Sequence, residues 1–185
     1  MNVFVLCTGR CGSLTFSKAC AHITNYTSGH ETRISHIGEE RLAYADRHIE
    51  IDNRLSWVLG RLDRVYGDSA AYVHLTRDRA AVAKSLRKRS TFGIMKAYKQ
   101  GVLMKAYQRG ALLDPKTRSS DLEIAHDYIE TVESNIALFL ANKSKVTPVR
   151  LETAQEDFPA FWRNIGAEGD MEAAVREWGA RYNAS

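Results

Sequence analysis

Residues 3–15, Val-Phe-Val-Leu-Cys-Thr-Gly-Arg-Cys-Gly-Ser-Leu-Thr, decide the fold expected for this chain. The apolar start of the stretch predicts a buried strand over 3–7. The glycine-containing segment over 8–13 is typical of a tight loop, and the residues after it predict a helix over 14–23. A strand, a tight loop and a helix in this order form the layout of an anion-binding loop. An ordinary strand-to-helix turn is the alternative for this stretch taken alone.

The composition of the loop suits an anion. Gly9 and Gly12 let the backbone turn sharply and approach a ligand closely. The amides that open the following helix are unpaired donors at the positive end of its dipole, which favours a negative group there. Arg10 adds a planar, charged fork that matches phosphate or sulfate oxygens. The loop is therefore predicted to bind phosphate or sulfate.

A second segment, over 71–85, repeats the pattern of strand, polar turn and helix. Arg77 lies just past the expected strand, and Ser85 follows eight residues later, about two helical turns along. Asp78 suits the N-cap of the helix between them. Arg77 and Ser85 are then placed to reach one further phosphate from the same side. Two anion sites at the carboxyl ends of two parallel strands predict a ligand with two separated anionic ends.

These two segments resemble those of the sulfotransferases that use 3′-phosphoadenosine-5′-phosphosulfate (PAPS). The family's second motif, which binds the 3′-phosphate, is similar to Arg77 and Ser85, and its late strand and helix look like residues 146–152, 157–159 and 161–166. The resemblance implies a fold like that of P-loop NTPases, with PAPS as cosubstrate and no metal. The family's first loop, which holds the 5′-phosphosulfate, resembles Thr8, Gly9, Arg10, Cys11, Gly12, Ser13, Leu14 and Thr15.

The resemblance also implies roles for single residues. Arg10 stands at the family's loop-cation position, where it would neutralise the bridging oxygen as the bond to sulfur breaks. The hydroxyl of Ser13 and the loop amides would hold the 5′-phosphate. Many members carry an aromatic residue shortly after the loop to stack on adenine, and the nearest one here is Phe16. Cytosolic members also have a late Arg-Lys-Gly element against the 3′-phosphate; this chain lacks it, and the basic run 87–89 is the expected substitute.

A hydroxyl acceptor needs a base, and family members use His or Glu. In the Glu-using members the base lies just past the second strand. Here that place holds His30 and Glu31, with Glu31 twenty-one positions beyond Arg10. We expect Glu31 to be the base in preference to His30. The alternative is that both are surface loop residues.

Other nucleotide- and phosphate-binding classes match less well. A P-loop kinase needs Gly-x-x-x-x-Gly-Lys-Ser/Thr, in which Lys reaches the phosphates and the hydroxyl holds magnesium, and the segment from Gly9 lacks Gly-Lys-Ser/Thr. A low-molecular-weight tyrosine phosphatase needs Arg six residues after its Cys, and six residues after Cys7 and Cys11 this chain has Ser. The phosphatase is excluded. A divergent P-loop kinase and a non-catalytic nucleotide- or anion-binding module of the same fold remain alternatives to a sulfotransferase.

Length and composition bound the protein as a whole. The 185 residues, 44% of them hydrophobic, predict a single domain over 1–185 with a real core. The net charge of +4 suits an anionic ligand, whereas the basic run 77–89 has no interleaved aromatic residues and does not predict nucleic-acid binding. The expected partner is a small-molecule or glycan acceptor. It would receive the sulfuryl group on a hydroxyl or, as the lesser option, on an amine. Acceptor identity and oligomeric state stay open.

The sequence also bears on compartment and metals. No run of about 18 apolar residues is present, so no membrane span is expected. Three cysteines within the first twenty residues argue against a disulfide framework and favour a reducing, cytoplasmic location. No HExxH or comparable metal-ligand spacing occurs, so no metal site is predicted.

Strands that alternate with helices predict a three-layer α/β/α domain with a small, mainly parallel sheet of four or five strands. The Asp52 side chain suits the N-cap of a helix that starts at 53. The remaining expected elements are extended pieces over 26–29 and 48–52, strands over 70–76 and 146–151, and helices over 38–47, 53–66, 79–89, 92–109, 121–142, 155–165 and 170–181.

Overall fold

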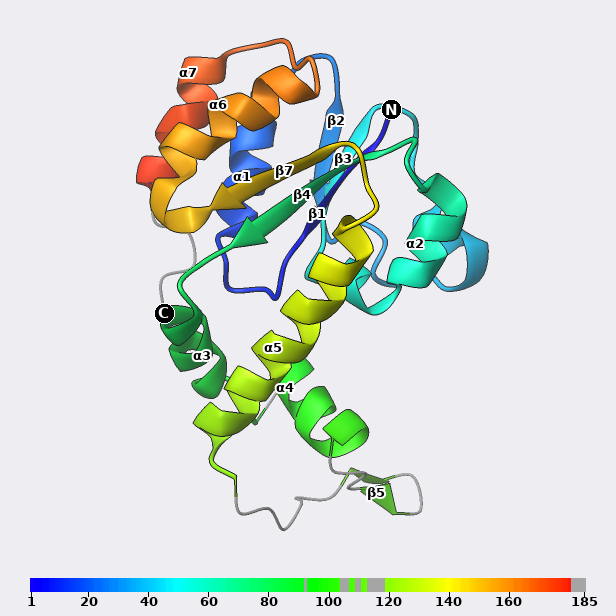
Figure 1. Ribbon diagram of the computed structural model, residues 1–185, viewed down its shortest axis with the longest axis vertical. Helices are drawn as coiled ribbons and strands as arrows, with labels where there is room; N and C mark the ends of the chain where they lie inside the picture. The colour runs from blue at the N-terminus through cyan, green and yellow to red at the C-terminus, as the bar shows by residue number, and fades with distance from the viewer. Residues whose placement is uncertain (92, 104–106, 109–110, 113–118, 181–185) are drawn as a thin grey trace.

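The computed structural model describes residues 1–91, 93–103, 107–108, 111–112 and 119–180. Its centre is a five-stranded sheet in the order β2-β3-β1-β4-β7, in which all neighbouring strands are parallel (Figure 1). The chain therefore has an α/β fold, as the alternation of elements predicted. The strands are β1 (Val3–Leu6), β2 (Thr27–His30), β3 (His48–Ile51), β4 (Ala71–Thr76) and β7 (Val146–Arg150).

The strand β1 lies in the middle of the sheet and is fully buried. It is apolar throughout because helices cover both faces of a parallel sheet, so neither face of its central strand meets water. β3 pairs with one edge of β1 and β4 with the other, so the connections leave β1 in opposite directions. The loop after β1 is thus at the topological switch point of the sheet, where ligands bind in open α/β folds.

One face of the sheet is covered by α2 (Leu59–Tyr66) and α5 (Asp121–Leu140). Aromatic rings make these contacts: Tyr66 of α2 packs on Phe4 of β1 with ring centroids 4.6 Å apart. Phe139 of α5 packs edge-on against Tyr72 of β4 at 5.1 Å.

The other face is covered by α1 (Ser13–Cys20), α6 (Ala154–Asn164) and α7 (Met171–Arg176) (Figure 1). Phe16 of α1 is fully buried and meets the ring of Phe161 of α6 at 5.1 Å. Helices on both faces of one parallel sheet are compatible with the predicted three-layer arrangement.

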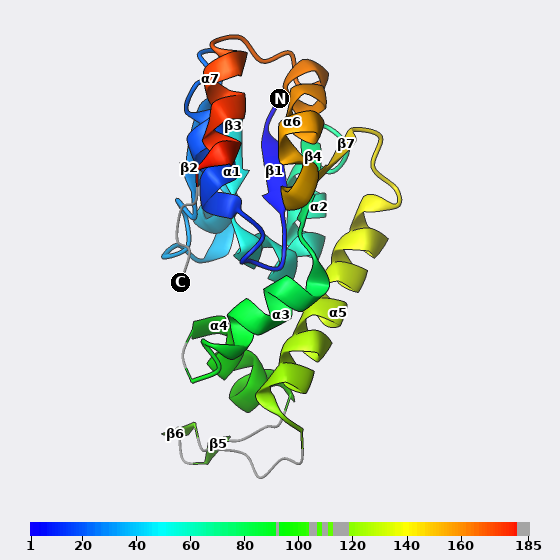
Figure 2. The same cartoon turned by 90° about the vertical axis from the view of Figure 1, so that its left-hand side faces the viewer.

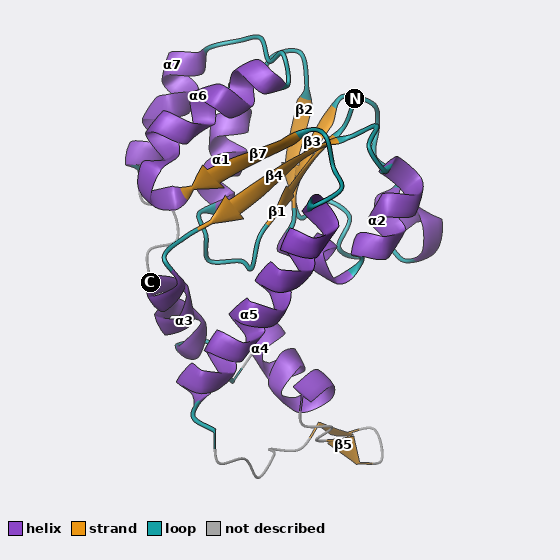
Figure 3. Cartoon of the chain, in the orientation of Figure 1, coloured by secondary structure: helices purple, strands orange, loops and turns teal. Residues whose placement is uncertain are grey.

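A mainly helical region extends beyond the carboxyl ends of the strands (Figures 2 and 3). The first half of α5 lies in this region, where Tyr98 packs on Tyr128 of α5 with ring centroids 5.3 Å apart. Its other elements are α3 (Arg79–Arg87), α4 (Gly93–Ala97), the π-helical turn η3 (Tyr98–Leu103) and the two-residue strands β5 (Tyr107–Gln108) and β6 (Ala111–Leu112).

Several predicted helices are shorter than expected. The segment 38–47 forms only the 3₁₀ turn η1 (Gly38–Leu42), and 53–66 is divided into the 3₁₀ turn η2 (Asn53–Trp57) and α2. The end of the helix predicted over 92–109 is wrong where it is described, because Tyr107–Gln108 is strand; residues 92, 104–106 and 109 lie outside the described residues.

The segment 170–181 forms α7 and then the 3₁₀ turn η5 (Glu177–Gly179), and residue 181 lies outside the described part of the chain. A further 3₁₀ turn, η4 (Leu151–Thr153), joins β7 to α6. Among the helices that the structure describes, none combines the length and the apolar character that crossing a membrane requires.

Candidate functional site

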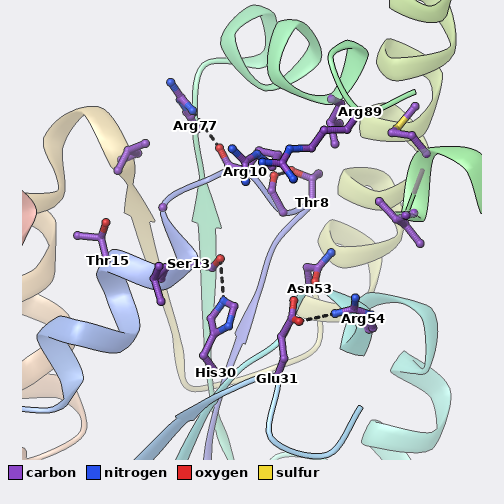
Figure 4. Close-up of a pocket in the computed structure, with 18 of the residues that line it drawn as sticks. Thr8, Arg10, Ser13, Thr15, His30, Glu31, Asn53, Arg54, Arg77 and Arg89 are labelled. Carbon is purple, nitrogen blue, oxygen red and sulfur yellow. Dashed lines mark hydrogen bonds and ion pairs between the residues drawn. The ribbon is translucent and has the colours of Figure 1, made fainter. Parts of the chain in front are cut away.

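The carboxyl ends of the five strands open into a pocket of about 700 Å³ (Figure 4). This is the edge of the sheet at which parallel α/β folds bind their ligands. Each strand end contributes to the lining: the loop from Thr8 after β1, His30 and Glu31 at β2, Asn53 and Arg54 after β3, Arg77 after β4, and Leu151 after β7. The sequence predictions for the loop, for Arg77 and for His30 and Glu31 therefore fall on one pocket.

The loop after β1 runs through left-handed backbone, with φ of 80° at Gly9, 60° at Arg10 and 88° at Gly12. Gly12 is also closely packed, because a Cβ there would lie 2.7 Å from Cδ1 of Leu151. Helix α1 begins at the next residue, and no side chain of the described residues caps it. Its first residues line the pocket, so their amides are available to a bound anion.

Buried groups hold the loop from beneath. The Tyr128 hydroxyl of α5 donates to the carbonyl oxygen of Thr8 at 3.0 Å. The Cys11 thiol donates to the carbonyl of Gly9 at 3.2 Å and lies 3.0 Å from the Thr8 hydroxyl. Cys11 is 1% exposed and does not line the pocket. Its side chain fills the space under the turn and, through these contacts, holds the loop in shape.

Two of the cysteines form a contacting pair. A hydrogen bond with Cys7 is the largest cause that lowers the pKa of the Cys11 thiol, and the same contact, together with burial, raises the pKa of Cys7. Hydrogen bonds with Thr8 also lower the pKa of Cys11. Cys7, Cys11 and Cys20 are all free and buried.

Three arginines gather at one side of the pocket (Figure 4). Arg77 donates from Nη1 to the carbonyl oxygen of Arg10 at 3.1 Å, so the predicted second motif holds the first loop directly. Arg89, just past α3, lies on the other side of Arg10 from Arg77 (Figure 4). Burial, followed by repulsion from Arg89 and Arg77, lowers the pKa of the Arg10 guanidinium. A group of like charges that repel one another is stabilised by an anion placed between them.

Ser85 contacts the first loop through Arg10. Arg10 donates from Nε to the Ser85 hydroxyl oxygen at 2.9 Å, and Ser85 itself does not line the pocket. The hydroxyl accepts this bond and keeps its own proton as a donor. Ser85 therefore orients Arg10 toward the pocket. The helix α3 that carries it is capped by Asp78, whose side chain accepts from the Ala81 amide, as expected.

His30 ends β2 and faces the loop. Its Nε2 lies 3.1 Å from the hydroxyl oxygen of Ser13 at the start of α1 (Figure 4). The histidine therefore contacts the residue that the resemblance assigns to the 5′-phosphate. A base at this place would be adjacent to the anion loop itself.

Glu31 follows in left-handed backbone, with φ of 57°. Its Oε2 lies 2.7 Å from Nη1 of Arg54, in an ion pair that lines the pocket (Figure 4). His30 and Glu31 are both partly buried, and each has a side-chain partner in the pocket, Ser13 and Arg54 respectively. Neither is therefore a freely exposed loop residue.

Two pocket residues, Asn53 and Arg54, carried no sequence signal for a site. They open η2, and the only indication was Asp52, predicted as an N-cap; its side chain does accept from the Arg54 amide at 2.8 Å. Asn53 also packs against the loop, because a Cβ at Gly9 would lie 3.1 Å from its Nδ2. The approach of β3 to β1 creates this contact, and the local sequence does not reveal it.

The aromatic wall of the pocket is not the one expected. Phe16 is fully buried among the rings of Phe158, Phe161 and Trp178, so it is excluded as a surface for stacking adenine. Trp178 of η5, which packs on Phe16, is the aromatic residue that lines the pocket among the described residues.

Comparisons with known proteins do not assign the chain to a family. Neither a scan of family models nor a search of curated proteins finds a match. The described residues also contain no group of three or more His, Cys, Asp or Glu side chains placed to hold a metal ion. The functional interpretation therefore depends on the geometry of the pocket.

Proposed function

We propose that this protein is a sulfotransferase that moves a sulfuryl group from PAPS to a hydroxyl, or less favourably an amine, of a small-molecule or glycan acceptor. One observation carries the proposal. Arg10 and Ser85 are 75 residues apart in the sequence and are joined by a hydrogen bond, and Arg77 binds the backbone of Arg10. The two motifs that resemble the family's 5′- and 3′-phosphate motifs thus belong to a single cationic site.

The pocket also fits the size and charge of such a ligand. A volume of about 700 Å³ is within the usual range for nucleotide-sized ligands. The charged residues of its lining are Arg10, Arg54, Arg77, Arg89 and Glu31, so cations predominate. The uncapped start of α1 adds donors without adding a side chain that would compete for the anion.

In the proposed reaction the acceptor oxygen forms a bond to sulfur while the bond from sulfur to the bridging oxygen breaks. The electron pair of the broken bond stays on the leaving phosphate, whose growing negative charge Arg10 and the α1 amides stabilise. The acceptor proton passes to a base, for which Glu31 is the first candidate and His30 the second. Transfer reactions of this kind depend mainly on positioning and electrostatic stabilisation, which this arrangement of charges supplies.

Calorimetry with 3′-phosphoadenosine-5′-phosphate (PAP) tests the nucleotide site. We expect binding in the micromolar range that Arg77→Ala weakens by about 10-fold or more, since a charge-assisted contact contributes about 1.5–3 kcal/mol. Arg79→Ala is the matched control: Arg79 lies two residues farther on, pairs with Glu130 outside the pocket, and should leave the affinity unchanged. Equal affinity for ATP, or binding that needs magnesium, would favour the divergent kinase instead.

Turnover with PAPS and a panel of phenols, alcohols, amines and oligosaccharides tests catalysis. Glu31→Gln should lower kcat by about 100-fold or more if Glu31 is the base, with PAP affinity retained. His30→Gln is the companion variant, and the larger of the two losses identifies the base. Tight PAP binding with no sulfated product from any acceptor would support a non-catalytic binding module.

A further inference from the structure

The end of β2 turns sharply at the pocket, and its shape requires support. Glu31 adopts left-handed backbone, which is unfavourable for a residue with a side chain. Its amide donates to the carbonyl oxygen of Ile51 at 3.0 Å, so the turn stays attached to β3. The next residue, Thr32, makes the hydrogen bonds that fix the path of the turn.

Thr32 is bound at two atoms by one buried carboxylate. Its amide donates to Oε1 of Glu50 at 2.7 Å, and its hydroxyl donates to Oε2 of the same side chain at 2.6 Å. Glu50 lies on β3 and is fully buried. His48 supplies a third contact, with Nε2 at 2.9 Å from Oε2. A carboxylate without solvent exposure needs such partners, so this set of contacts holds Thr32 firmly.

The packing around this contact leaves little freedom. A Cβ at Gly29 would lie 2.1 Å from Cγ2 of Thr32, so the turn folds directly over the glycine of β2. Glu50 is the cross-strand neighbour of Gly29, which places its carboxylate under the turn. The absent side chain at Gly29 thus makes the space in which Thr32 and Glu50 meet.

Arg54, the ion-pair partner of Glu31, is held by a second buried carboxylate, which lies just past the end of β3. Asp52 is fully buried and accepts from the Arg54 amide at 2.8 Å. Its other oxygen accepts from Nη2 of Arg41. Glu50 and Asp52 are two residues apart, so one anchors the Glu31 side of the ion pair and the other anchors the Arg54 side.

From this arrangement we propose that Glu50 is a positioning residue, which acts through Thr32 to hold Glu31 against Arg54 at the pocket. The Thr32 hydroxyl is the link that transmits the position. The catalytic meaning of the link rests on the proposed function, but the link itself concerns only the geometry of the protein. Removal of the hydroxyl should release Glu31 from Arg54 and leave the arginine cluster around Arg10 unchanged.

The test compares Thr32→Val with Thr32→Ser, because the first removes the hydroxyl and the second keeps it. NMR of the Arg54 guanidinium group reports on the ion pair, since a carboxylate bound to Nη1 slows rotation of that group. We expect slow rotation in the wild type and in Thr32→Ser, and fast rotation in Thr32→Val. Thr27→Val is the control: it removes a 2.8 Å contact with Nδ1 of His48 in the same network and should leave the Arg54 signal unchanged.

Kinetics supply the second measurement. Thr32→Val should lower kcat by about 10- to 100-fold with an unchanged KM for PAPS, which is the effect of a misplaced catalytic group. Thr32→Ser, which keeps the hydroxyl, should retain the wild-type kcat. If wild-type protein does not bind PAP, the proposed function fails and the Arg54 signal alone decides the positioning role. Slow Arg54 rotation in Thr32→Val overturns the proposal in either case. Glu50→Gln would be the direct variant, but it risks unfolding, and for this reason the Thr32 pair carries the test.

Discussion

At the scale of single residues, the proposed binding of PAP depends most directly on the guanidinium groups of Arg10, Arg77 and Arg89. They line one side of the pocket, and their mutual repulsion contributes to the lowered pKa of Arg10. An arginine remains charged in such surroundings, so the three groups continue to repel one another. If the pocket binds PAP as proposed, this repulsion favours a ligand with concentrated negative charge.

Arg89→Ala is therefore expected to have opposite effects on binding and on stability. PAP affinity should fall by about 10-fold, because one charge-assisted contact is lost, while the protein without ligand should become slightly more stable in urea. Arg87→Ala is the control, since Arg87 is exposed on α3 and does not line the pocket. Calorimetry and urea unfolding measure both quantities. Unchanged affinity in Arg89→Ala would show that Arg89 makes no contact with the ligand.

Residue types at particular spacings predicted much of this site. Arg10 and Arg77 could be identified because each follows an apolar strand, and the carboxyl ends of parallel strands meet at one edge. Asn53 and Arg54 could not, since their place in the pocket depends on how β3 lies beside β1 and β2. Trp178 lines the pocket, and the expected Phe16 does not, for a similar reason. The periodicity of α1 directs Phe16 into the core, whereas Trp178 belongs to an element that is distant in the sequence.

At the scale of elements, the junction of β1 with α1 combines loop strain with close packing. Gly12 holds φ at 88°, and a Cβ added to it would lie 2.7 Å from Cδ1 of Leu151 in η4. A residue with a side chain would there meet both an unfavourable backbone conformation and a clash with the element that follows β7. Gly12 precedes the first residue of α1, so the shape of the loop sets the direction of the amides that are proposed to bind the anion.

Gly12→Ala should destabilise the protein by roughly 1–3 kcal/mol and weaken PAP binding by about 10-fold or more. Gly60→Ala makes an informative control, because Gly60 lies in α2 with no atom within 4 Å of an added Cβ. That substitution should instead stabilise the protein by about 0.5–1 kcal/mol, with unchanged affinity. Urea unfolding and calorimetry give both values. Equal stability of the two variants would contradict the role of Gly12.

The strands β1 and β4 were predictable because each is a short, largely apolar run that must be buried, whereas the helices of 38–47 and 53–66 were not. Arg41 interrupts the first: it is buried and binds Asp52, which ties η1 to the sheet and ends it early. Trp57 interrupts the second, because its ring packs on Tyr98 and Tyr128, and Val58 leaves helical backbone with φ of −128°. In both places a tertiary contact overrides a sound local pattern.

At the scale of the whole molecule, the sheet carries one group whose burial ties global stability to pH. His74 lies on β4, between Leu6 of β1 and Pro148 of β7. Its Nε2 is buried and has no hydrogen-bond partner among the described residues. Burial lowers the pKa of His74, because the charged ring cannot be solvated there. The native state therefore resists protonation at a pH where the unfolded chain accepts a proton.

The sign of the pH dependence follows from this difference. As pH falls below the usual histidine value of about 6.5, the unfolded state binds a proton that the native state refuses, so stability decreases until the native pKa is reached. Asp68, whose pKa is lowered by hydrogen bonds from the Ser144 amide and hydroxyl, acts in a more acidic range and does not interfere. Urea unfolding between pH 7.5 and 5 should thus show falling stability, with a slope of at most about 1.4 kcal/mol per pH unit for this one group.

His74→Gln should reduce that slope, since glutamine does not titrate and keeps a polar side chain at the position. His126→Gln is the control, because His126 is exposed on α5 and should leave the slope as in the wild type. The strands around His74 also support the pocket at their carboxyl ends, so PAP binding at pH 7.5 should be the same in all three proteins. An identical pH dependence in the wild type and His74→Gln would show that the cost of protonating the buried ring at this position does not govern stability in this range.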